Sequence, residues 1–170
     1  WPVSAEQAER IGFEKEEIYR EWIRKDGIRP IPGVLDFLGE ARRYDIPCGV
    51  GSSAPRENVE LCLKALRLEA AFTATVSGAD VRRGKPAPDI FLKAAELMGV
   101  PPGQCLVFED APAGIAAAQA AGMRVYALLT SHAREELADA DALAPDFIGL
   151  SPLSLRTHWT PLSLPDFHEA

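Results

Sequence analysis

The chain has 170 residues, of which 47% are hydrophobic and 25% are charged. This composition is typical of a globular domain and excludes a disordered chain, a collagen or a coiled coil as a description of the whole. Eighteen basic and 25 acidic residues leave a net charge of −7, which disfavours a broad phosphate-backbone-binding surface. Apolar runs are too short to cross a bilayer. We therefore expect neither nucleic acid nor a membrane as a partner.

The chain begins with a predicted helix and continues as alternating strands and helices. Ser4 and Gln7 form a capping box for the first helix, whose apolar residues repeat at helical spacing as far as Asp26. Residues 27–33 contain two prolines, which interrupt the helix. The following helices are expected at 34–44, 56–66, 89–98, 113–121 and 134–138, and the strands at 47–51, 73–77, 105–108, 125–129 and 147–148.

Repeated strand–helix alternation with short connections predicts an α/β fold with parallel strands and right-handed crossovers. We expect a Rossmann-like parallel sheet with helices on both faces. Residues 151–170 are proline-rich with little apolar pattern and are interpreted as a tail. Three cysteines without metal-like spacing, each among apolar neighbours, favour reduced thiols in a cytoplasmic protein. Separately, we expect a monomer.

Polar residues follow each of the first three predicted strands, 47–51, 73–77 and 105–108. Ligands of open parallel sheets bind beyond the carboxyl ends of the strands. The hydroxyl of Ser52 and the backbone amides of Ser53 and Ala54, close to a helix start, are suited to phosphate. Lys85, in the loop after the second strand, would supply a positive charge.

Glu109 and Asp110 follow the third strand as two adjacent carboxylates. Their mutual repulsion calls for a cation, and Mg²⁺ prefers such hard oxygen ligands. Phosphate, Mg²⁺ and Lys85 together predict phosphoryl transfer.

Each of these motifs also has a structural interpretation. The serine pair is suited to a helix cap, residues 84–89 to a turn, and the Glu-Asp pair to a solvated loop. Residues 49–54 match G-x-G-x-x-A, but the next strand lacks the acid that a dinucleotide site needs. Pro86 after Lys85 excludes a P-loop. The three histidines, without evident partners, are predicted to lie on the surface: His132, His158 and His168.

Four segments, 31–34, 49–53, 84–91 and 107–114, resemble motifs of the haloacid dehalogenase-like superfamily. The resemblance covers about residues 14–150 and is to the branch of β-phosphoglucomutase and related sugar-phosphate phosphatases. It implies a Mg²⁺-dependent phosphatase or phosphomutase that acts on a small phosphorylated metabolite through an aspartyl-phosphate.

The resemblance also implies roles for individual residues. Ser52 is similar to the hydroxyl that binds the transferring phosphoryl group, and Lys85 to the lysine beside it. Asp110, helped by Glu109, is similar to the Mg²⁺ ligand, and Lys15 to a cap residue that faces substrate, although a solvated helix face explains Lys15 equally well. On this basis residues 1–28 belong to a helical cap, 29–150 to the α/β core and 151–170 to a tail.

The first motif of the family, an apolar strand ending in Asp-x-Asp-Gly, has no counterpart here. Asp139 and Asp141 have the spacing but follow a polar helix, and Asp26 also ends a helix. We therefore expect a core without its central strand, with unpaired strand edges, and a natural product that extends further at its N-terminus. The chain alone would be inactive, and the alternative is a non-catalytic remnant that binds phosphate or a protein partner.

Overall fold

The computed structural model describes residues 3–158. Its α-helices are α1 (Ala5–Asp26), α2 (Val34–Arg43), α3 (Arg56–Leu66), α4 (Asp89–Met98), α5 (Pro112–Ala120) and α6 (Pro152–His158). Its strands are β1 (Gly49–Gly51), β2 (Ala74–Val76), β3 (Leu106–Glu109), β4 (Arg124–Leu128) and β5 (Ala142–Ala144). Within the described range, none of the helices has the length and apolar character needed to span a bilayer.

Within the described residues the strands form two sheets, and every paired strand runs parallel to its neighbour. β1 pairs with β2, with Gly49 opposite Ala74. β3, β4 and β5 form the second sheet in that order, with Leu106 opposite Arg124. Within residues 3–158, β1 and β3 each have a strand partner on one side alone. This arrangement confirms the predicted α/β class, and the missing central strand stays a prediction.

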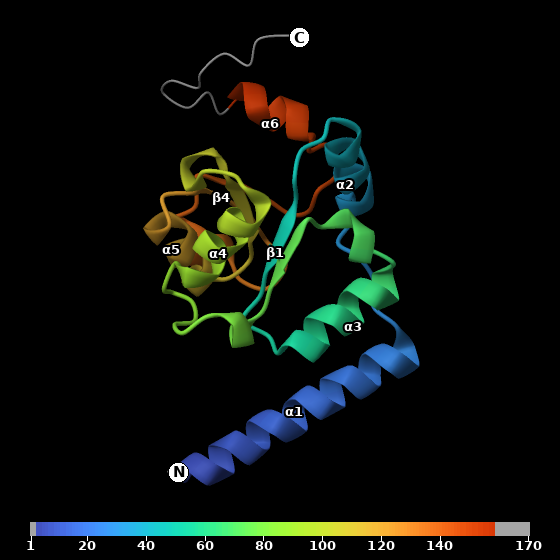
Figure 1. The fold of residues 1–170 in the computed structure, drawn as a ribbon, viewed down its shortest axis with the longest axis vertical. Helices are drawn as coiled ribbons and strands as arrows, with labels where there is room; N and C mark the ends of the chain where they lie inside the picture. The colour runs from blue at the N-terminus through green and yellow to red at the C-terminus, as the bar shows by residue number, and fades with distance from the viewer. Residues whose placement is uncertain (1–2, 159–170) are drawn as a thin grey trace.

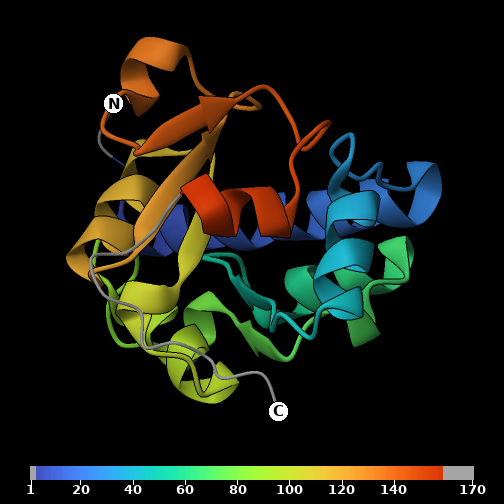
Figure 2. The same cartoon turned by 90° about the horizontal axis from the view of Figure 1, so that it is seen from above.

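The two faces of the larger sheet are covered by different helices (Figures 1 and 2). On one face, α5 packs against β3 and β4, while α4 packs against β1 and β2 of the smaller sheet; Ile90, Ile115 and Val125 belong to the core that these helices share. On the other, α2 and the segment before α6 form an aromatic cluster in which the Phe37 and Phe147 rings lie 5.2 Å apart. Apolar burial on both faces explains why these strands are rich in hydrophobic residues instead of alternating.

The connector between α1 and α2 is fastened to the aromatic cluster at Gly33. This residue has a φ of +79°, and a Cβ atom there would lie 2.5 Å from the carbonyl carbon of Phe147. The Phe147 amide donates a hydrogen bond to the Pro32 carbonyl at 2.9 Å. Only glycine tolerates both the backbone angle and the close approach, so the Pro-Gly pair fixes where α2 begins.

Two C-terminal elements differ from the prediction. The last strand is β5, at 142–144, whereas Phe147 lies in the following turn and points into the aromatic cluster. Alanine has little preference for strands, which explains why the Ala-Leu-Ala segment was not predicted. Residues 152–158 form α6, which packs against α2, where the sequence predicted an irregular tail.

The first helix follows the sequence prediction closely. The Ser4 hydroxyl accepts a hydrogen bond from the Gln7 amide at 3.1 Å, and the Gln7 side chain accepts one from the Ser4 amide at 2.8 Å. Gly27 ends the helix. α1 packs mainly on α3 and lies along one side of the molecule (Figure 1), and Ile23 is its buried apolar residue.

Candidate phosphate and metal site

Lys85 connects the carboxyl ends of the two sheets. Its ammonium lies 3.2 Å from the carbonyl oxygen of Gly51, at the end of β1, and forms an ion pair with Glu109, at the end of β3. The Phe91 ring centroid lies 4.8 Å from the same nitrogen. The Lys85 and Glu109 side chains are only 13% and 9% exposed, so the charge is held in a nearly dry position where electrostatic interactions are strong.

Glu109 occupies space that a side chain at position 114 would fill. A Cβ atom on Gly114 would lie 2.1 Å from the Glu109 carboxyl carbon. Gly114 lies in the first turn of α5, directly after the Glu-Asp pair. The glycine therefore lets the carboxylate lie against the helix and reach Lys85.

Asp110 is held by the loop that follows β4. Its carboxylate accepts hydrogen bonds from the hydroxyls of Thr130, at 3.0 Å, and Ser131. The His132 Nδ1 atom lies 2.8 Å from the Asp110 carbonyl oxygen. The prediction that His132 has no partner was wrong, because the loop after β4 folds back over the end of β3. The side chains of His158 and His168 lie outside the described residues.

The Ser52 loop continues directly from β1 toward α3. The Ser52 amide donates to the Val76 carbonyl at 2.9 Å, and the Ala54 amide donates to the Ser52 hydroxyl oxygen at 3.2 Å. The hydroxyl oxygen thus acts as an acceptor within its own loop, and its proton stays available for another acceptor. The Ala54 amide, which was expected to face phosphate, is already bonded in this structure.

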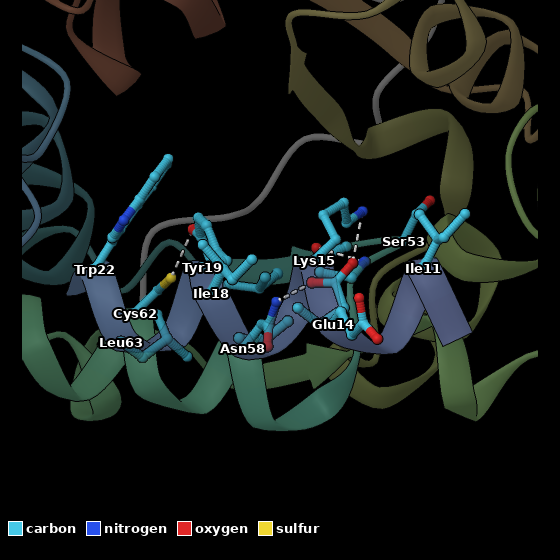
Figure 3. Close-up of a pocket in the computed structure, with 15 residues that line it drawn as sticks. Ile11, Glu14, Lys15, Ile18, Tyr19, Trp22, Ser53, Asn58, Cys62 and Leu63 are labelled. Atoms are coloured by element: carbon cyan, nitrogen blue, oxygen red, sulfur yellow. Dashed lines mark hydrogen bonds and ion pairs between the residues drawn. The ribbon is translucent and has the colours of Figure 1, made fainter. Parts of the chain in front are cut away.

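A groove of about 920 Å³ lies between α1, β1 and α3. Its lining includes four of the residues singled out in the sequence: Lys15, Ser52, Ser53 and Ala54. Lys15 and Ser53 extend toward the same side of α1 (Figure 3). The Lys15 side chain is 72% exposed, and its ammonium lies 2.6 Å from Glu16. The structure therefore places Lys15 beside the serine loop, and Lys85 with Glu109.

Residues that the sequence interpretation missed complete these contacts. Thr130 and Ser131 hold Asp110, and Asn58 joins α3 to α1. Thr130 and Ser131 follow the fourth predicted strand, and this position was a signal for them, because the carboxyl ends of parallel strands lie at one edge of a sheet. Asn58 had no such signal, since its partners lie far away in the sequence.

The carboxylates could hold one small divalent cation. Within residues 3–158, no cluster of three or more histidine, cysteine or acidic side chains has the arrangement of a metal site. Mg²⁺ is commonly held by one or two carboxylates and completes its coordination with water and substrate phosphate. Glu109 and Asp110, adjacent at the end of β3, fit that limited requirement.

A parallel α/β core with a largely buried lysine and paired carboxylates at its carboxyl edge is suited to binding a phosphoryl group. The family model of the haloacid dehalogenase-like hydrolases matches residues 3–122. The chain therefore belongs to the haloacid dehalogenase-like hydrolase family, as its motifs predicted.

Two curated relatives similar to this chain are named as phosphatases, and one similar solved structure is a phosphomutase. The chain is 39% identical over 116 residues to validoxylamine A 7'-phosphate phosphatase of Streptomyces hygroscopicus subsp. limoneus, covering 68% of this chain and 54% of the relative. It is 43% identical over 115 residues to fructose-1-phosphate phosphatase YqaB of Escherichia coli, covering 66% and 58%. The crystal structure of β-phosphoglucomutase from Clostridium difficile aligns with a TM-score of 0.78 at 25% identity, covering 91% of this chain and 68% of that one. The chain thus spans little more than half the length of these two curated relatives.

Proposed function

We propose that this chain forms the phosphate- and Mg²⁺-binding part of a phosphatase or phosphomutase that acts on a small, sugar-like phosphorylated metabolite. The observation that carries this proposal is the position of Lys85, held between the ends of β1 and β3 beside Glu109. A preorganised cation near a hydroxyl-bearing loop is suited to stabilising charge on a transferring phosphoryl group. The names of the relatives support this substrate class.

Each side chain has a distinct part in the proposal. Ser52 donates its hydroxyl proton to a phosphoryl oxygen, with the Ser53 amide beside it, and Lys85 supplies the positive charge. Glu109 and Asp110 would hold Mg²⁺, which when bound neutralises negative charge on the phosphoryl oxygens. Lys15, on the α1 side of the groove, would contact the rest of the metabolite.

The reaction is proposed to pass through an aspartyl-phosphate, which requires an aspartate nucleophile. Asp110 is bonded by Thr130 and Ser131, and the Asp141 carboxylate accepts from the Val125 amide at 2.7 Å, near the amino end of β4. Neither is placed to attack a phosphoryl group beside Lys85. The sequence also lacks the Asp-x-Asp-Gly motif, and we propose that the nucleophile lies outside these 170 residues and that the chain alone does not turn over substrate. A cytoplasmic location, compatible with three free thiols, is part of the same proposal.

The test is phosphate release from a panel of sugar phosphates, including fructose 1-phosphate, with Mg²⁺ or with EDTA. Two proteins are compared: the 170-residue chain and the product of the longest reading frame that contains it. We expect Mg²⁺-dependent release from the longer protein and background release from the shorter one. Robust Mg²⁺-dependent release by the shorter chain would contradict the proposed origin of the nucleophile. Absence of release by the longer protein, with inorganic phosphate still bound, would instead establish the non-catalytic alternative.

A further inference from the structure

Asn58 is a buried polar residue that no part of the proposed chemistry uses. It lies in the first turn of α3, directly after the serine loop, and is 2% exposed. Its neighbour Val59 is buried in the core side of the same helix, at 7% exposure. Burying an amide is favourable only when its donor and acceptor are both bonded, so the partners of Asn58 explain why it is there.

Both partners come from α1. The Arg20 Nη1 atom donates to the Asn58 carbonyl oxygen at 2.8 Å, and the Asn58 amide nitrogen donates to the Glu16 carboxylate. The Arg20 and Glu16 side chains are only 12% and 20% exposed. An asparagine side chain offers one acceptor and an amide donor, which matches one cation and one anion spaced a helical turn apart. Hydrogen bonds with ionised partners of this kind are stronger than neutral ones.

Glu16 also connects this cluster to the groove. Its carboxylate accepts a hydrogen bond from the Asn58 amide and forms an ion pair with the Lys15 ammonium. The Lys15 ammonium and the Asn58 amide hold the pKa of Glu16 below its usual range, so the residue is charged at neutral pH. Lys15 precedes Glu16 in the chain and therefore moves with it.

We propose that Asn58 is a positioning residue that fixes α1 relative to the Ser52–Ser53 loop and thereby holds Lys15 at the groove. A hydrogen bond of 3.3 Å between Tyr19 and Cys62 joins the same two helices a turn further on, but the ion–amide contacts lie closest to Lys15. Loss of the Asn58 contacts frees α1 to shift relative to α3 and the serine loop. The consequence for substrate binding rests on the proposed function, whereas the helix coupling does not.

An exchange of the two side-chain types tests this arrangement. Asn58→Asp keeps the acceptor for Arg20 but removes the donor and places a second negative charge beside Glu16. Adding Glu16→Gln restores the hydrogen bond with donor and acceptor interchanged. Glu21→Gln, an exposed acidic position on the same helix, is the control for charge removal. All variants are made in the product of the longest reading frame that contains the chain.

Two measurements separate positioning from general stability. Hydrogen exchange of the α1 amides should become several-fold faster in Asn58→Asp, return toward wild type in the double variant and stay unchanged in Glu21→Gln. KM for the best sugar phosphate of the panel should rise about tenfold with kcat within twofold, and the double variant should restore it. Unchanged α1 exchange in Asn58→Asp, or a double variant no better than the single one, would overturn the coupling. A fall in kcat with KM unchanged would overturn the link to Lys15. If no sugar phosphate is turned over, the proposed function fails, while the exchange measurement still decides the coupling.

Discussion

Lys85 is held by three different groups: a backbone carbonyl, a carboxylate and an aromatic face. Gly51 and Glu109 belong to the two separate sheets, and Phe91 belongs to α4. The ammonium is thus aimed from a fixed position before any phosphate arrives. Because both members of the Lys85–Glu109 pair are nearly buried, removing one leaves an uncompensated charge, which costs more than the pair itself contributes.

We expect Lys85→Ala to lower kcat/KM by about 10²–10³-fold in the active protein, because it removes a preorganised charge at the phosphoryl group. Lys85→Arg should not restore activity, since a planar, forked guanidinium does not fit a position shaped for a compact ammonium. Steady-state kinetics at saturating Mg²⁺ measures both.

Arg83→Ala is the matched control for this series. The structure pairs Arg83 with Asp89 at 2.7 Å and leaves the Arg83 side chain 71% exposed. Exposed ion pairs contribute about 1 kcal/mol or less, so kcat/KM should change little. A Lys85→Ala variant that keeps more than about half of the wild-type kcat/KM would mean that residues 84–86 form only a turn.

Gly114→Ala should destabilise the fold, because the added methyl group would overlap the Glu109 carboxylate. Either α5 or the carboxylate must move, and such overpacking costs about 1–3 kcal/mol. Urea unfolding measures the difference. Gly103→Ala is the control, because a Cβ at Gly103 meets no atom within 4 Å. Equal stability of the two variants would contradict the tight contact between Glu109 and α5.

The sequence was sufficient to predict which residues lie at strand ends, but not which side chains touch. Ser52, Lys85 and the Glu-Asp pair follow strands, and parallel strands bring such residues to one edge. The contact between Glu109 and Gly114 depends on how closely α5 packs against the end of β3. The contacts of Asn58 depend on how α1 packs against α3. Strand order and spacing contain no information on either approach.

At the scale of elements, helices were predicted more accurately than strands. α3 and α4 have the predicted bounds, 56–66 and 89–98, because an apolar face repeats over several turns. The strands have three to five residues, too few for a clear period. β5 has mostly small side chains and is identified only by its pairing with β4.

The turn after β2 gives a pH-dependent prediction. The Asp80 carboxylate accepts hydrogen bonds from the Ser77 amide and hydroxyl, at 2.8 and 2.7 Å, and pairs with Arg56. The Ser77 contacts, followed by the Arg56 charge, hold the pKa of Asp80 below its usual value. A carboxyl group whose pKa is lower in the folded than in the unfolded protein stabilises the fold at pH values above its pKa in the unfolded protein. This stabilisation is lost as the pH falls through the pKa of the folded protein.

We therefore expect Asp80→Asn to unfold at a lower temperature than wild type at pH 7. The difference in unfolding temperature between the two proteins, the gap, should narrow as the pH falls below about 4, the ordinary pKa of an aspartate, because the wild-type carboxyl then becomes protonated. Thermal unfolding from pH 7 down to the lowest pH at which the chain still folds measures the gap. A gap that does not change with pH would show that the Asp80 charge does not stabilise the turn.

At the level of the whole molecule, different polar residues lie at the amino and the carboxyl ends of the strands. Ser52, Lys85 and Asp110 follow the carboxyl ends of strands, whereas Asp141 binds the Val125 amide near the amino end of β4. Asp139 is exposed, and its carbonyl oxygen accepts a hydrogen bond from Gln119 at 2.7 Å. Asp139 and Asp141, which have the Asp-x-Asp spacing, therefore make structural contacts, and Asp141 does so near the amino end of a strand. The proposed chemistry lies at the carboxyl ends of the strands.

The proposed metal site is the pair of carboxylates at the end of β3, Glu109 and Asp110. Its most direct test is the Mg²⁺ concentration needed for half-maximal phosphate release by the active protein carrying Asp110→Asn or Asp139→Asn. We predict that Asp110→Asn raises this concentration about tenfold or more and lowers the rate, because it removes a carboxylate ligand. Asp139→Asn should leave both values within twofold of wild type. Equal effects of the two substitutions would contradict the assignment of the metal site to the Glu-Asp pair.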